Sequence, residues 1–322
     1  MMTMPLKSVT TTTAPASAAI APSDHTHCLI GMTRLNDFLR FVRERVSGGR
    51  TLDPGDLAHS WREAATVFKG LQTSEAGAAD HPDIKPLSSR LEAHVAQLVA
   101  LPYFQKTFSM VPVAFGMVEL DKLIVCQQQI KRASVDTMTR TLTTPLSDAD
   151  LATVCLPLTS SGAGFQLALE EAGQIIFTSD THDARFLDAQ LVNPTDIRGL
   201  VVSGHAQTVL ALSLGFTTNV LNVVRYGARI VLNNGYHRAL ALRELGVTHA
   251  PCVIQVCSHW EDVALAGASE MSDNGAVYFT AARPPLLRDF ANSDLCRTFV
   301  TRPLRKQIRL TYEIETDQLD LS

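Results

Sequence analysis

The sequence predicts an α+β fold, in which a mixed-sheet domain over residues 108–260 follows an N-terminal helical region over residues 30–107. Two observations support this prediction. Apolar residues recur at every third or fourth position in the first of these regions, which is the periodicity of amphipathic helices. Short β-branched and apolar runs dominate the second region, and helical segments fall between some of them. Such a mixture of strands and helices is typical of the α+β class.

The composition is that of a globular protein. Of the 322 residues, 46% are hydrophobic and 19% are charged, which excludes a wholly disordered or fibrous chain. The length suits one large domain or two ordinary ones. The chain has 28 Lys and Arg residues against 32 Asp and Glu residues, and its net charge is −4. This balance excludes a strongly basic, nucleic-acid-coating protein but not a local basic patch.

Residues 1–29 are predicted to form a disordered leader, because they contain no long apolar segment of the kind found in signal peptides. None of the six cysteines forms a C-x-x-C pair, so buried, reduced thiols in a cytoplasmic protein are expected. Residues 199–224 contain no Asp, Glu, Lys or Arg, but their many polar side chains disfavour a membrane helix. Buried strands and turns are expected there instead, with no membrane association.

The helical region contains three predicted helices. The first has an apolar stripe from Leu35 to Val46 and ends at the glycine pair 48–49. The second begins at Pro54, because proline suits the first helical position and Asp53 is a favourable N-cap. The third follows the loop that ends at Pro86.

The mixed-sheet domain is expected to contain a helix over 235–245 and eight strands, at 111–120, 123–126, 154–158, 174–177, 200–202, 220–224, 228–232 and 252–256. Residues 261–322 are predicted to be a C-terminal extension. Apolar residues alternate over 307–315 in this extension, which indicates a late, half-buried strand.

The most informative segment combines a strand, a turn and a helix. The strand ends at Leu232, the Asn-Asn-Gly sequence at 233–235 forms a turn that tolerates positive φ, and the helix begins near residue 236. The free N–H groups at a helix start attract anions, and a glycine there permits close approach. An arginine adds a bidentate donor, and a histidine adds a donor or a proton carrier. The predicted phosphate cradle therefore consists of Asn234, Gly235, Tyr236, His237 and Arg238.

The segment from Asn234 to Ala239 resembles the G-x-x-R signature of the ParB/sulfiredoxin superfamily, which includes chromosome-partition proteins, sulfiredoxin and an archaeal free-serine kinase. The preceding hairpin, 223–232, agrees with this resemblance, which is good over 220–257. Residues 118–128 more weakly resemble the family's opening strand, with its acidic residue and downstream glutamine. The resemblance implies a ParB/sulfiredoxin-like mixed-sheet domain that binds nucleotide phosphates, with ATP or CTP and Mg²⁺ as the expected ligands.

Differences from individual members narrow the implied chemistry. Tyr236 occupies the position of the sulfiredoxin catalytic cysteine, so reduction of sulfinic acids is not expected. No second phosphate motif or helix-turn-helix follows Gln255, which argues against a DNA clamp. The free-serine kinase uses an acidic base. In a phosphotransferase or NTP hydrolase of this type, the resemblance implies that Glu119, Asp121 and His237 are catalytic.

Two alternatives stay open. A non-catalytic binding or scaffold protein would keep the fold and bind a protein partner through the N-terminal helices. A nucleic-acid-associated protein would use the basic run at residues 297, 302, 305, 306 and 309, although a solvated face is favoured because no aromatic residues are interleaved. The polar run at 179–185 is expected to be a loop, and its acids are alternative partners for Arg238.

Overall fold

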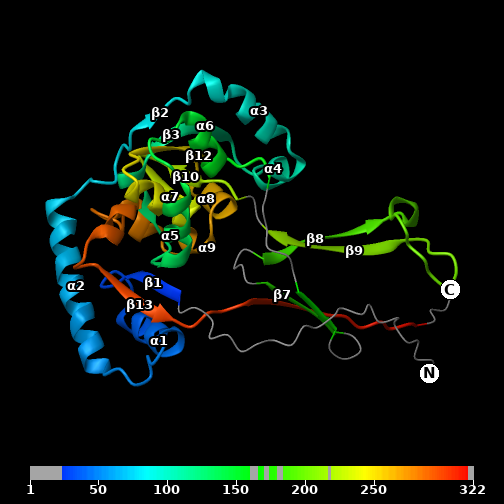
Figure 1. Cartoon of the computed structure of the whole chain (residues 1–322), viewed down its shortest axis with the longest axis horizontal. Helices are drawn as coiled ribbons and strands as arrows, with labels where there is room; N and C mark the ends of the chain where they lie inside the picture. Colours follow the sequence, from blue (N-terminus) through cyan, green and yellow to red (C-terminus); the bar gives the residue numbers. More distant parts are fainter. Residues whose placement is uncertain (1–23, 160–165, 170–173, 180–183, 217–218, 318–322) are drawn as a thin grey trace.

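The computed structural model describes residues 24–159, 166–169, 174–179, 184–216 and 219–317. It confirms the α+β class. The described chain contains a six-stranded mixed sheet, two three-stranded sheets and a two-stranded sheet, with helices around the largest sheet (Figure 1). No helix in these ranges combines the length and hydrophobicity that a transmembrane segment requires.

The six-stranded sheet has the order β2-β3-β12-β10-β11-β4. Its strands are β2 (Ile84–Lys85), β3 (Val113–Glu119), β4 (Ile124–Val125), β10 (Asn222–Tyr226), β11 (Arg229–Asn234) and β12 (His249–Cys257). The β10–β12 and β11–β4 pairs are parallel, and the other neighbours are antiparallel. Its middle strands bury consecutive β-branched residues such as Val223 and Val224, as strands covered on both faces do. Five predicted strands are confirmed here, whereas β2 was not predicted.

Helices cover this sheet. The predicted helix over 235–245 is confirmed as α7 (Tyr236–Glu244), which connects β11 to β12 and packs against α5 (Arg132–Thr141). The neighbouring helix α6 (Asp148–Cys155) packs against β12, and α8 (Trp260–Ala266) contacts β10 and β12. The short helix α9 (Ser269–Asp273) follows α8. The largest apolar core includes side chains of α7 and of the sheet, so α7 is held rigidly in place.

The N-terminal region is helical, as predicted. Its helices are α1 (Leu35–Arg45), α2 (Pro54–Ser74), α3 (Glu92–Ala100) and α4 (Pro102–Thr107). The predicted start of α2 is confirmed, because Oδ1 of Asp53 accepts a hydrogen bond of 2.7 Å from the backbone N–H of Gly55. A separate apolar core joins α1 to the C-terminal part of the chain, where the Phe38 and Phe41 rings contact Phe299.

The prediction of a disordered leader over 1–29 is wrong from Asp24 onward. Residues Asp24–Leu29 form β1, the middle strand of a sheet with β13 (Cys296–Thr301) and β5 (Gln129–Lys131). Thr26 and Cys28 are buried in this sheet. The stabilising partners of β1 lie far away in the sequence, so a local pattern does not indicate the strand. Residues 1–23 lie outside the described ranges.

Two predicted strands are absent from their described segments. Residues 154–158 do not form a strand because α6 extends to Cys155, and Ser147 and Asp150 cap the start of this helix reciprocally. That capping box outweighs the β propensity of the segment. Residues 200–202 form no strand either, and Val201 is 91% exposed.

The remaining strands form an arm that extends to the right in Figure 1. They are β6 (Gln166–Leu169), β7 (Gln174–Ser179), β8 (Ala184–Val192), β9 (Val209–Phe216) and β14 (Lys306–Thr311). β7 and β14 confirm two predicted strands, although β14 ends before Tyr312. The uncharged stretch 199–224 includes β9, which is paired with β8 and carries the exposed Leu210. The expectation that this stretch is buried is therefore wrong for β9.

Candidate functional site

The strand–turn–helix segment is present, with one difference from the prediction. Asn233 and Asn234 continue β11, and Gly235 alone makes the turn into α7, with a φ of 97°. A Cβ atom at Gly235 would lie 2.8 Å from Cδ1 and 3.3 Å from Cα of Leu221. Both the positive φ and this close approach require glycine. The first turn of α7 consequently begins directly at the end of a buried strand.

Tyr236 is a structural residue of this turn. Its hydroxyl donates a hydrogen bond of 2.6 Å to the carbonyl of Leu232 and accepts bonds from the N–H groups of Cys126 and Gln127, at 3.3 and 3.4 Å. Burial raises the pKa of Tyr236 far above its ordinary value, so the phenol stays neutral. These bonds hold the segment that follows β4 against the start of α7.

Arg238 lies on the first turn of α7 and is 4% exposed. Its Nη2 donates a hydrogen bond of 2.7 Å to Oδ1 of Asn219, a residue just before β10. This bond orients the guanidinium. The acids at 180 and 183, which were alternative partners for Arg238, lie outside the described residues.

A cavity of about 710 Å³ opens at the start of α7. All five predicted cradle residues line it, together with Gln127, Gln128 and Gln129 from the segment after β4. Among the described lining residues, the charged side chains are Arg45, Lys131 and Arg238, and none is a carboxylate. Three basic side chains and a helix N-terminus give this cavity the electrostatic character of an anion site.

Glu119 and Asp121 do not face this cavity, so the prediction that they act at the cradle is wrong. Oδ1 of Asp121 lies 2.5 Å from Nε of Arg243, in the last turn of α7. From the start of α7 to Arg243 the helix rises roughly 10 Å, at about 1.5 Å per residue. Glu119 is opposite His249 in the β3–β12 pair, and its Oε2 accepts a bond from the Asp83 N–H. Glu119 ends β3 and Asp121 follows two residues later, so the direction of this strand places both carboxylates at the C-terminal end of α7, away from the cradle.

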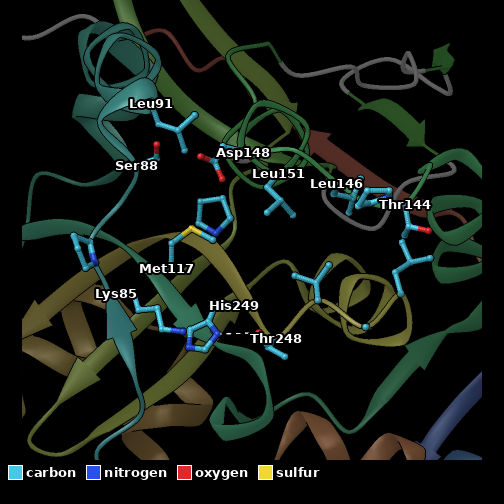
Figure 2. Close-up of a pocket in the computed structure, with 16 residues that line it drawn as sticks. Lys85, Ser88, Leu91, Met117, Thr144, Leu146, Asp148, Leu151, Thr248 and His249 are labelled. Atoms are coloured by element: carbon cyan, nitrogen blue, oxygen red, sulfur yellow. Dashed lines mark hydrogen bonds between the residues drawn. The ribbon is translucent and has the colours of Figure 1, made fainter.

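A larger cavity, of about 850 Å³, lies at the C-terminal end of α7 (Figure 2). Figure 2 shows His249 beside Lys85, with its ring bonded to Thr248. Nε2 of His249 lies 3.2 Å from Oδ2 of Asp83. The charged lining side chains of this cavity, Lys85 and Asp148, have opposite signs, and the helix end is the negative end of the dipole. The smaller cavity is therefore the better candidate for an anionic ligand.

The donor set of the smaller cavity fits phosphate groups but does not fit a protein-bound Mg²⁺ ion. Magnesium in nucleotide sites is usually held by one or two carboxylates as well as phosphate oxygens. The described lining supplies no carboxylate, and no cluster of three His, Cys, Asp or Glu residues suited to a metal was found in the described part of the chain. The expected Mg²⁺ thus has no protein ligand among these residues.

All six cysteines are free thiols, and burial raises the pKa of each. The pKa rises to about 12 for Cys28, Cys126 and Cys155, to about 11 for Cys257 and Cys296, and well above its ordinary value for Cys252. A thiol with a raised pKa carries little thiolate at neutral pH, and the thiolate is the nucleophile.

We therefore expect the native protein to show no ATP-dependent repair of sulfinylated peroxiredoxin.

Iodoacetamide should label the folded protein more slowly than free cysteine at pH 7 to 9, with a rate that still rises above pH 9. Mass spectrometry of the labelled peptides measures this rate, and urea-unfolded protein is the control. Rapid labelling of Cys126 at pH 7 would contradict the expectation.

Sequence reasoning did not identify Arg45, Lys131 and Asn219 as residues of the site. Arg45 belongs to α1, Lys131 to β5 and Asn219 to the approach to β10. No local pattern marks any of them, because each reaches the cavity through the packing of a separate element. Gln127 and Gln128 did have a signal, the glutamine downstream of the opening strand.

Comparison with models of known protein families, with curated proteins and with solved structures gives no match to this chain.

Proposed function

We propose that this chain binds the phosphates of ATP, CTP or a related nucleotide at the start of α7, as a ParB/sulfiredoxin-like protein. The observation that carries the proposal is the cavity of about 710 Å³ where the left-handed Gly235, the α7 N-terminus and Arg238 meet, with only basic charged side chains in its described lining. Cavities of this size hold small organic ligands.

Each component has a distinct part in binding. The N–H groups at the start of α7 donate to phosphate oxygens and place the positive end of the helix dipole beside them. The absence of a side chain at Gly235 lets a phosphate group approach the backbone. Arg238, oriented by Asn219, presents a planar fork that matches two phosphate oxygens.

Binding is better supported than phosphoryl transfer. A general base must lie within hydrogen-bond reach of the group it deprotonates, and Glu119 and Asp121 lie at the other end of α7. His237 lines the cavity and is the cradle residue suited to moving a proton. A phosphotransferase or NTP hydrolase is the second candidate, and it would depend on His237.

The nucleic-acid alternative gains little support from the basic run near the C-terminus. The Arg302 guanidinium donates to the carbonyl of Glu44, and the Arg297 guanidinium donates to the carbonyl of Ser293. Both side chains therefore have structural roles at the surface. Lys306 and Arg309 lie on β14, in the arm.

The test is a thermal-shift and calorimetric titration with ATP, CTP, GTP, their monophosphates and inorganic tripolyphosphate. We expect at least one triphosphate to bind, and to add about 2.7 kcal/mol of stability at 100 times its dissociation constant. Binding should persist in EDTA, because no carboxylate in the described cavity lining recruits Mg²⁺. Failure of every nucleotide and of tripolyphosphate to bind would overturn the proposal. Salt-sensitive binding of DNA alone would favour the nucleic-acid alternative.

A further inference from the structure

One wall of the phosphate-binding cavity comes from elements outside the predicted cradle. Phe41 and Arg45 of α1, Thr26 of β1 and Thr301 of β13 all line it. The Thr26 and Thr301 hydroxyl oxygens are 2.8 Å apart and hydrogen-bonded, and both residues are buried. This side of the cavity is therefore lined by two strands and a helix that come from opposite ends of the described chain.

The backbone that carries Arg45 is fixed by β13 and the residue after it. Val46 forms an antiparallel bridge with Thr301, and the N–H of Ser47 donates a bond of 2.8 Å to the carbonyl of Val300. The carbonyl of Arg45 accepts a bond of 2.9 Å from the N–H of Arg302. These backbone contacts hold the last turn of α1 beside the cavity, which the Arg45 side chain lines.

The Arg45 side chain differs from most buried or half-buried arginines of this protein. Arg132, Arg229, Arg243 and Arg283 each form an ion pair with a carboxylate. Within the described ranges Arg45 has no such ion pair, and its Nε is buried without a hydrogen-bond partner. A buried donor without a hydrogen-bond partner lowers the stability of the folded protein unless a ligand or a water molecule bonds to it. Its position at the cavity makes an anionic ligand the natural partner.

We propose that Arg45 is a second phosphate-binding residue. The first phosphate group of the ligand lies at the start of α7, and Arg45 binds another phosphate group of the same di- or triphosphate chain. This inference rests on the proposed function. A cavity of about 710 Å³ is far larger than one phosphate group, and a single phosphate at α7 is already served by the helix N–H groups and Arg238. Arg45 therefore selects ligands with a di- or triphosphate chain over monophosphates.

The test compares inorganic phosphate, pyrophosphate and tripolyphosphate by isothermal titration against wild type and the variants Arg45→Ala and Arg45→Gln. Both variants should lower the affinity for tripolyphosphate about tenfold or more, as expected for loss of a charge-assisted contact. The affinity for inorganic phosphate should change less than about twofold by the same reasoning. The melting temperature of the ligand-free protein should not fall, because Nε of Arg45 has no hydrogen-bond partner to lose among the described residues.

Arg43→Ala is the matched control, because Arg43 lies in the same helical turn, is 64% exposed and does not line the cavity. This variant should bind all three probes like wild type. If wild type binds tripolyphosphate and the Arg45 variants bind it equally well, Arg45 is not a ligand and the inference fails while the proposed function stands. If the Arg45 variants lose affinity for inorganic phosphate and for tripolyphosphate by the same factor, Arg45 does not discriminate between ligands by the length of their phosphate chain, and the inference also fails. If wild type binds a nucleotide but none of the three inorganic probes, the inference fails while the proposed function stands. If it binds neither the probes nor any nucleotide, the proposed function itself fails.

Discussion

Replacing Arg238 by alanine is expected to weaken triphosphate binding roughly 10- to 150-fold, the equivalent of one charge-assisted hydrogen bond to a charged group. Arg238 combines a positive charge with a fixed orientation, because its bond to Oδ1 of Asn219 holds the guanidinium on the first turn of α7. Arg238→Lys should recover only part of the loss, since an ammonium group lacks the planar fork. Isothermal titration with tripolyphosphate and the best nucleotide measures both effects.

Arg243→Ala is the control for that experiment. Arg243 belongs to the same helix, but it is paired with Asp121 at the far end of α7, so the loss of its side chain should leave the affinity for triphosphates unchanged.

Arg238→Ala is also expected to lower the melting temperature, because Asn219 loses a hydrogen-bond partner. A lower melting temperature with unchanged affinity would show that Arg238 has a structural role alone, which would contradict the proposed function.

Replacing Arg283 by alanine is expected to destabilise the fold by about 3–5 kcal/mol, the usual cost of removing one partner from a buried ion pair. Arg283 is 1% exposed and Asp289 is 2% exposed. Nη2 of Arg283 lies 2.6 Å from Oδ1 of Asp289, and Nη1 donates to the other carboxylate oxygen. Nε and Nη2 also donate bonds of 3.1 Å to Glu75, and the guanidinium lies 5.6 Å from the Phe68 ring centroid.

The ion pairs of Arg283 with Glu75 and Asp289 join the end of α2 to the C-terminal part of the chain, so their loss should weaken the packing of both segments. Urea denaturation of Arg283→Ala measures the change in the free energy of unfolding. Arg288→Ala is the control, because Arg288 also pairs with Glu75 but is 31% exposed, and exposed ion pairs contribute at most about 1 kcal/mol. The double variant Arg283→Met/Asp289→Leu should recover much of the loss, since it leaves no unpaired buried charge. Equal effects of Arg283→Ala and Arg288→Ala would contradict the expected role of burial.

The local sequence was sufficient for features that depend on neighbouring residues. Asp53 and Pro54 define the start of α2, since a cap and the first helical residue act within one turn. Gly235 marks the turn from β11 into α7 in the same way, because a positive φ is a property of that residue's own backbone. The predicted cradle residues line one cavity for this reason: they are consecutive in the chain.

Local signals failed where a competing local signal or a distant partner decided the structure. The apolar residues 154–158 suggested a strand, but the capping box at Ser147 had already started a helix. β1 was assigned to a disordered leader because its pairing partners are β5 and β13.

The sequence by itself determined the α+β class, the strand–turn–helix at Gly235 and the five cradle residues. The tertiary structure alone decided which charged residues face them. Glu119 and Asp121 resemble catalytic acids in the sequence, yet the antiparallel pairing of β3 with β12 carries them to the far end of α7. Arg45 has no distinguishing neighbours in the sequence, yet the pairing of Val46 with Thr301 holds it at the cavity. The physical reason is range: helix caps and tight turns depend on adjacent residues, whereas the set of charges around a ligand depends on contacts between segments that only the folded chain brings together.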